Sequence, residues 1–186
     1  MLTSISPLGE RARGNRWTVT VTLYVVASLL GGLTMGALLG FAGSLFGGSV
    51  LAAAVMCAVA AVLDLVRRLP TIHRQVDEDW LTRYRGWVYG VGFGYQLGLG
   101  VVTIVTSAAT YAMLALCVFS GSTAAGLAIG GCFGLVRALP ILALRRATTP
   151  AALRAVAARL EVLASAAGRA TTVVLAGAAV ALAVAA

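Results

Sequence analysis

Two similar apolar stretches constrain the fold of this chain more than any other feature. Residues 46–70 read FGGSVLAAAVMCAVAAVLDLVRRLP, and residues 119–140 read FSGSTAAGLAIGGCFGLVRALP. Each begins with Phe, a small residue, Gly and Ser, stays apolar for about the length of one membrane helix, and ends in Arg followed by Leu-Pro. Another long apolar run precedes each copy, at residues 17–45 and 86–118. We therefore expect two helical hairpins in tandem, followed by a tail.

The composition places the chain in a membrane. Hydrophobic residues make up 60% of the 186 residues and charged residues 11%, whereas a soluble domain carries roughly a quarter charged residues. The sequence therefore predicts an all-α, polytopic integral membrane protein with about five transmembrane helices. The predicted spans are residues 17–45, 50–66, 90–118, 122–143 and 170–186.

The arginines indicate how these spans are oriented. All 14 basic residues are Arg, and most lie at residues 11–16, 67–85 and 145–159. The turn inside each hairpin carries no charge. Because cytoplasmic loops are enriched in Lys and Arg, we expect the N-terminus in the cytoplasm, the C-terminus outside, and the chain in a bacterial cytoplasmic membrane. Topology accounts for the net charge of +8, so no nucleic-acid partner is expected.

These features divide the chain into five regions. A cytoplasmic N-terminal segment, a first hairpin, a polar cytoplasmic loop, a second hairpin, and a basic amphipathic linker with a last membrane helix are expected at residues 1–16, 17–70, 71–85, 86–143 and 144–186. Thr149 and Pro150 are a cap and a first-turn proline for the linker helix. We expect its first turns along the cytoplasmic surface and residues 170–186 across the bilayer.

Glycines recur at every fourth position in two of the predicted spans. This spacing places them on one helix face, where another backbone can approach closely. The residues are Gly32, Gly36 and Gly40 in the first span and Gly126, Gly130 and Gly134 in the fourth. They predict close helix packing, either within the chain or with a second copy or other membrane subunits.

The third span is the most polar and the richest in glycine. Its glycines are dense enough to loosen or break a helix, and its polar groups fall near one face. The candidates for a substrate path are Gln96, Gly98, Gly100, Thr103, Thr106 and Thr110. Irregular backbone of this kind lines transport sites, but glycine packing and hydroxyls bonded to their own helix explain the same pattern.

Asp64 and Arg137 are charged residues near the ends of the second and fourth spans. A charge within a span usually pairs with another or lines a wet path. One interpretation is a cytoplasmic gate, or a proton or anion site, formed by the two side chains. The alternative is an interfacial ion pair, or an Arg137 side chain that extends to the membrane surface.

No catalytic or metal-binding pattern is evident. His73 and Asp77 could share a helix face, but His73 is the only histidine, and structural zinc prefers several Cys and His ligands. Cys57, Cys117 and Cys132 lie inside apolar runs without metal-binding spacing. We therefore expect no cofactor, no metal and no enzymatic activity.

The C-terminal half resembles the CcdA/DsbD-type membrane thiol–disulfide carriers. The matching stretches are GFGYQLGLGVV, SGS, FGLVRALPILAL and RRATTPAALRAVAARLEVL, followed by a final apolar helix, within residues 86–186. The resemblance implies a helix pair ending in Leu-Pro, a basic cytoplasmic linker and a last span. The family's redox cysteines are absent: the matching part of the third span, LGVVTIVTS, contains no Cys. The wider superfamily of small-solute exporters then implies transport.

The preferred function at this stage is movement of a small solute or ion across the membrane. The site is expected between the first and third spans, near Gln96, Thr103 and Thr106, with Asp64 and Arg137 as the gate. Two alternatives stay open. One is a non-catalytic membrane subunit or assembly factor, and the other is a thiol–disulfide carrier that uses other cysteines. Besides the lipid bilayer, the expected partners are a second copy of the chain or other membrane subunits.

Overall fold

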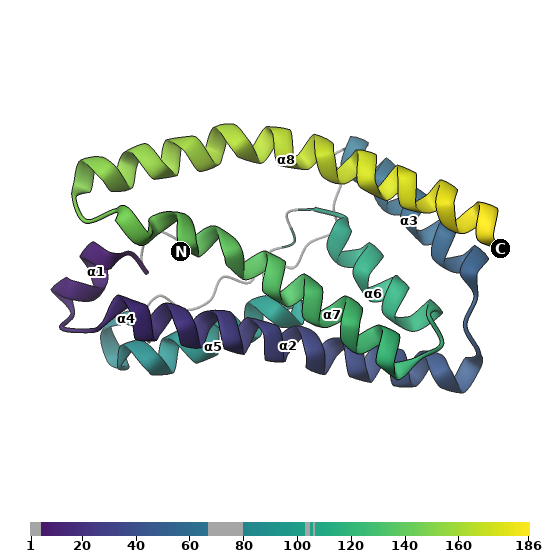
Figure 1. The fold of residues 1–186 in the computed structure, drawn as a ribbon, viewed down its shortest axis with the longest axis horizontal. Coiled ribbons are helices and arrows are strands. Elements are labelled where there is room, and N and C mark those ends of the chain that lie inside the picture. The colour runs from purple at the N-terminus through teal and green to yellow at the C-terminus, as the bar shows by residue number, and fades with distance from the viewer. Residues whose placement is uncertain (1–4, 67–79, 103–104, 106) are drawn as a thin grey trace.

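The computed structural model describes residues 5–66, 80–102, 105 and 107–186, and these ranges contain helices and no strand. The central element is α2 (Trp17–Phe46), which packs mainly against α5 (Gly86–Leu99) and α7 (Thr123–Ala138) (Figure 1). The other elements are α1 (Pro7–Ala12), α3 (Val50–Val66), α4 (Trp80–Arg83), α6 (Ala109–Phe119), the 3-10 helix η1 (Leu139–Arg146) and α8 (Pro150–Ala185). The predicted all-α class is confirmed for the described part of the chain.

Three of the described helices are long and apolar enough to cross a membrane. They cover Trp17–Phe46, Thr123–Arg146 and Pro150–Ala185, while α3 and α6 are shorter apolar helices. The predicted third span, residues 90–118, is not one helix. It is divided between α5, whose 14 residues reach only about 21 Å at 1.5 Å per residue, and α6.

Glycines bring the backbones of α2 and α7 into contact. A methyl group added to Gly32 would collide with the carbonyl oxygen of Gly130, and one added to Gly36 would collide with that of Gly126. Gly40 and Gly134 lie at the same contact, Gly40 against Ser122 and Gly126, and Gly134 against Ser28. The two glycine faces therefore pack against each other within this chain.

A second glycine ladder joins α5 to another face of α2. The glycines of α5 at every fourth position, Gly86, Gly90, Gly94 and Gly98, face the α2 residues Thr20, Tyr24 and Ser28. A methyl group at Gly94 or Gly98 would collide with a carbonyl oxygen of α2. Since such close contacts leave no room for a side chain, α2, α5 and α7 form a tightly packed layer.

The turns that begin the two similar stretches also meet. Gly47 and Gly121 have φ of 76° and 61°, values that glycine adopts without steric cost. The backbone N–H of Ser49 donates a 3.0 Å hydrogen bond to the carbonyl oxygen of Phe119. The turn between α2 and α3 is therefore held against the turn between α6 and α7.

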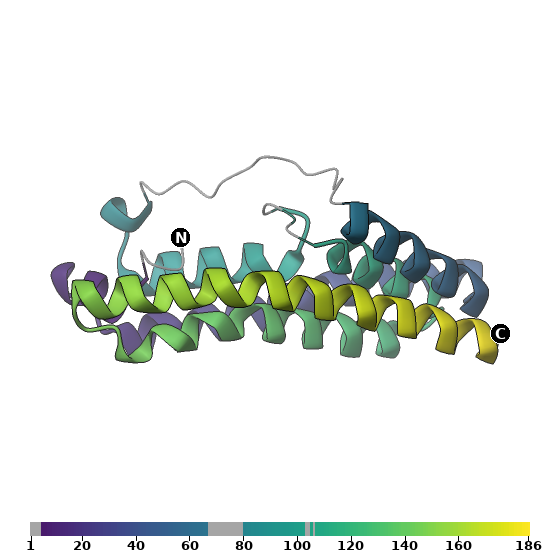
Figure 2. The same ribbon diagram turned by 90° about the horizontal axis from the view of Figure 1, so that it is seen from above.

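Helices α3, α6 and α8 lie beside this layer, and α3 packs against both α6 and α8. Figures 1 and 2 show α8 running along the length of the molecule, with its C-terminal half beside α3. The hydroxyl of Thr149 accepts a 3.2 Å hydrogen bond from the N–H of Ala152 and caps this helix. The predicted linker and last span are one continuous 36-residue helix. Most of the predicted polar loop, including His73 and Asp77, lies outside the described residues.

Candidate functional site

The interruption between α5 and α6 is the most unusual feature of the backbone. Helix α5 ends at Leu99, Gly100 follows with φ of 80°, and α6 begins only at Ala109. A helix that ends leaves carbonyl groups without partners, and one that begins leaves N–H groups without partners. Such groups are costly to bury without a partner, so their partners identify what stabilises the interruption.

Arg137 lies at the end of α5. Its Nη1 donates long hydrogen bonds to the carbonyl oxygens of Leu97 and Gly100, at 3.4 and 3.5 Å. Its guanidinium carbon is 5.4 Å from the centre of the Phe133 ring, a cation–π contact. The cation therefore faces the negative end of the α5 dipole.

Asp64 lies at the start of α6. Its Oδ1 accepts a 2.6 Å hydrogen bond from the backbone N–H of Ala108, and its Oδ2 accepts a 2.9 Å hydrogen bond from the Ser107 hydroxyl. The carboxylate from the last turn of α3 thus caps α6 and faces the positive end of its dipole. Asp64 and Arg137 form no ion pair with each other. The salt bridge found among the described residues joins Arg13 and Glu10.

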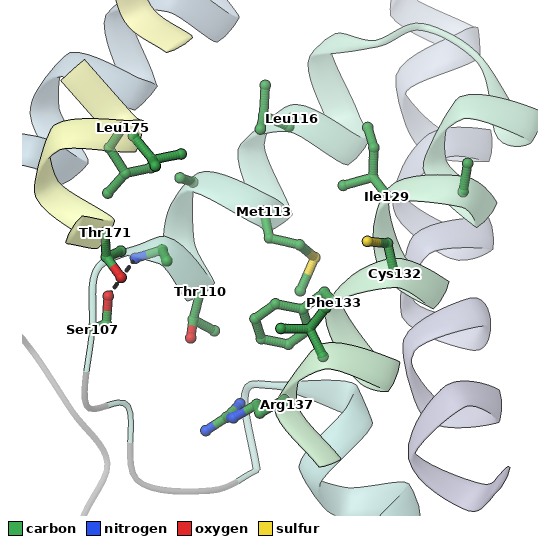
Figure 3. Close-up of a pocket in the computed structure, with 15 residues that line it drawn as sticks. Ser107, Thr110, Met113, Leu116, Ile129, Cys132, Phe133, Arg137, Thr171 and Leu175 are labelled. Atoms are coloured by element: carbon green, nitrogen blue, oxygen red, sulfur yellow. Dashed lines mark hydrogen bonds between the residues drawn. The ribbon is translucent and has the colours of Figure 1, made fainter. Parts of the chain in front are cut away.

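A cavity of about 790 Å³ lies beside the interruption, between α6, α7 and α8. Its wall is mostly apolar and includes Met113, Ile129, Phe133 and Leu175. Figure 3 shows Arg137 at one end of this cavity, with the ring of Phe133 between it and Met113. The cavity is open to the surface, and its volume falls within the roughly 300–1,000 Å³ of typical ligand sites.

The residues predicted to form a substrate path do not lie together in one site. Thr110 is buried and lines the cavity, whereas Gly98 packs against α2 and Gly100 forms the break. Gln96 is half-buried on α5, and Thr103 and Thr106 lie outside the described residues. The cavity is not between α2 and α5, where the predicted site would be, because glycine contacts close that interface.

The structure contains a buried polar cluster near the N-terminus that the sequence did not predict. Glu10 is fully buried, and its carboxylate accepts hydrogen bonds from the Tyr89 hydroxyl at 2.5 Å, Thr20 at 2.8 Å and Arg13 at 2.6 Å. Asn15 donates to the Tyr89 hydroxyl at 3.1 Å. Burial lowers the pKa of Arg13, but hydrogen bonding to Glu10 and Tyr89 outweighs burial and raises it overall. The cluster ties α1 to α2 and α5.

One sequence signal for this segment was available. Ser6 followed by Pro7 is a typical helix start, and the Ser6 hydroxyl accepts a 3.1 Å hydrogen bond from the N–H of Gly9. The contact between Glu10 and Tyr89 could not be predicted from a local sequence pattern, since the two residues are far apart in the sequence. Elsewhere in the described ranges, no group of three or more His, Cys, Asp and Glu could hold a metal. The three cysteines are free, with Cys57 and Cys117 buried and Cys132 exposed.

Comparisons with known proteins indicate a different context from the one predicted. No family model and no solved structure matches the chain. It is 33% identical to the methylamine utilization protein MauF of Paracoccus versutus in an alignment of 152 residues that covers 74% of this chain and 56% of that protein. MauF of Paracoccus denitrificans is 33% identical, over 74% of this chain and 54% of that protein. MauF of Methylobacillus flagellatus is 31% identical, over 68% of this chain and 48% of that protein. The chain thus spans about half the length of these relatives.

These relatives correct three predictions. They are named methylamine utilization proteins, and not thiol–disulfide carriers or small-solute exporters, so the resemblance to the CcdA/DsbD type is wrong. The predicted transport of a solute or ion and the thiol–disulfide alternative fail with it. The resemblance rested on Gly, Leu and Pro in apolar helices, and these residues are common in the helices of unrelated membrane proteins.

Proposed function

We propose that this chain is a membrane protein that takes part in methylamine utilization. The observation that carries the proposal is its similarity to MauF proteins from several bacteria, at 28–33% identity over 68–76% of the chain. The long apolar helices support a membrane location.

The proposed role is non-catalytic and does not involve binding methylamine in the cavity. Methylamine, like the amine of lysine, is a cation at neutral pH. Among the described residues that line the cavity, the charged one is Arg137, and its guanidinium repels a cation. The cavity is also far larger than a molecule with one methyl group requires. These features favour a part played alongside other proteins of the utilization system.

The proposed topology places the N-terminus in the cytoplasm of a bacterium and the C-terminus on the other side of the inner membrane. Its support is the enrichment of Arg near α1 and the start of α8. In Figure 1, α1 and the C-terminus lie at opposite ends of the molecule. The middle of α8, residues 161–170, is exposed at every position, and it offers contact area for lipid, a second copy or another membrane subunit.

Growth of a deletion strain tests the proposal. The gene is removed from its host, and growth is compared on methylamine and on ammonium as the nitrogen source. We expect loss of growth on methylamine alone, restored by the wild-type gene on a plasmid. Restoration with Gly36→Leu, whose side chain cannot fit between α2 and α7, is expected to fail, while Gly177→Leu on the exposed face of α8 succeeds. Unchanged growth of the deletion strain on methylamine would refute the proposal.

A further inference from the structure

We infer that the cavity between α6, α7 and α8 binds an anionic lipid of the bilayer, with its apolar chain inside the cavity and its acidic head group against Arg137. This inference rests on the proposed membrane location, but it does not depend on the role in methylamine utilization. It rests on the shape, lining and charge of the cavity, which the packing of the helices does not explain.

The lining selects an apolar body. Met113 and Leu116 of α6, Ile129 and Phe133 of α7, and Val174 and Leu175 of α8 contribute to the wall. A protein core closes such space with side chains, because interiors pack as densely as organic crystals. Here about 790 Å³ remains, and it is open to the surface of the protein. A membrane places lipid chains beside an opening of this kind.

The polar end selects an anionic head. Arg137 is half-buried at the cavity, where its guanidinium contacts the Phe133 ring and the carbonyl oxygens at the end of α5. Guanidinium groups match carboxylate and phosphate oxygens geometrically. A cation or a neutral chain does not complement this end, so the charge favours an acidic amphiphile.

The lining also supplies a native reporter. Cys132 is exposed and lines the cavity, whereas Cys57 and Cys117 are both 0% exposed. A thiol reagent that reaches the cavity therefore labels Cys132 first, and an occupant shields it. Val173 of α8 is 71% exposed and does not line the cavity, so Val173→Cys gives a matched control position.

The experiment measures labelling of the full-length protein in phosphatidylcholine nanodiscs. N-ethylmaleimide is added after doping with oleate or with oleyl alcohol, which has the same chain without the charge, at a pH where oleate is ionised. The label on Cys132 is then quantified by mass spectrometry. We expect oleate to slow labelling about tenfold relative to oleyl alcohol, as a mostly occupied site requires. Val173→Cys should react equally in both.

Variants at Arg137 identify the head-group contact. Arg137→Gln should abolish the difference between the two probes, and Arg137→Lys should retain part of it because the charge persists. If Arg137→Gln does not fold, the comparison of oleate with oleyl alcohol on the wild-type protein still tests the inference. Equal labelling with both probes, or oleate protection that survives Arg137→Gln, would overturn the inference.

Discussion

The hydroxyl of Ser28 in α2 donates a 2.7 Å hydrogen bond to the carbonyl oxygen of Gly134 in α7. Ser28 is fully buried, and a methyl group on Gly134 would collide with the carbonyl oxygen of Ser28. The two backbones approach this closely because neither residue carries a large side chain. The contact between α2 and α7 therefore combines small residues with an interhelical hydrogen bond, as helix association in lipid favours.

Replacing Ser28 by Ala removes this bond without adding bulk. We expect the free energy of unfolding to fall by only about 0.6 kcal/mol, the average for interhelical hydrogen bonds in a membrane protein. The measurement is unfolding by SDS titration in mixed micelles. Ser165→Ala is the control, since Ser165 is exposed and bonds back to Val162 in its own helix. A larger loss for Ser165→Ala than for Ser28→Ala would contradict this reading.

Replacing Gly36 by Ala adds one methyl group where the carbonyl oxygen of Gly126 leaves no space. We expect a loss of about 1–3 kcal/mol, the usual cost of overpacking. Gly177→Ala in α8 is the matched control, because nothing lies within 4 Å of its added methyl group. There the change should raise stability by about 0.5–1 kcal/mol, since Ala favours helix more than Gly. Equal effects of the two changes would show that the contact between α2 and α7 is absent.

Much of the helical framework could be predicted from the sequence, because charges and glycines bound the apolar runs. The predicted spans 17–45 and 50–66 agree within one residue with α2 and α3. The interruption after Gly100 could not be located, since glycine also packs inside the neighbouring helices. Whether a glycine ends a helix or packs inside it depends on tertiary contacts with α2.

The candidate site was predictable only in part. Asp64 and Arg137 stand out as charges in apolar runs, but sequence gives no distances between helices. Their partners are the ends of two short helices, and a helix end is visible only once the break is known. The cavity likewise depends on how α8 lies over α6 and α7.

Asp64→Ala removes the carboxylate that caps α6. Loss of an N-terminal cap usually costs about 0.5–2 kcal/mol, and we expect a value in the upper half, because the freed N–H of Ala108 is buried. Asp64→Asn should cost less, since its amide oxygen still accepts that hydrogen bond. SDS titration measures both. If Asp64→Asn is as damaging as Asp64→Ala, the negative charge matters beyond the cap.

Tyr89→Phe tests whether the Glu10 cluster holds the N-terminal segment in place. The change removes the hydroxyl that donates to Glu10 and accepts from Asn15, and it leaves the sequence around Arg11 unaltered. A hydrogen bond to a charged group contributes about 1.5–3 kcal/mol, so local opening of α1 should become at least about tenfold more frequent. Trypsin cleavage after the exposed Arg11 should accelerate by the same factor in the purified protein.

The control for this experiment is Tyr84→Phe. Tyr84 is 49% exposed and stacks edge-on against Trp80, outside the cluster, so its loss of a hydroxyl should leave the cleavage rate unchanged. Thr20→Val, which removes another donor to Glu10, should accelerate cleavage as Tyr89→Phe does. If both cluster variants are cut after Arg11 no faster than the wild type, apolar contacts such as the burial of Ile5, rather than the carboxylate, fix α1 against α2 and α5.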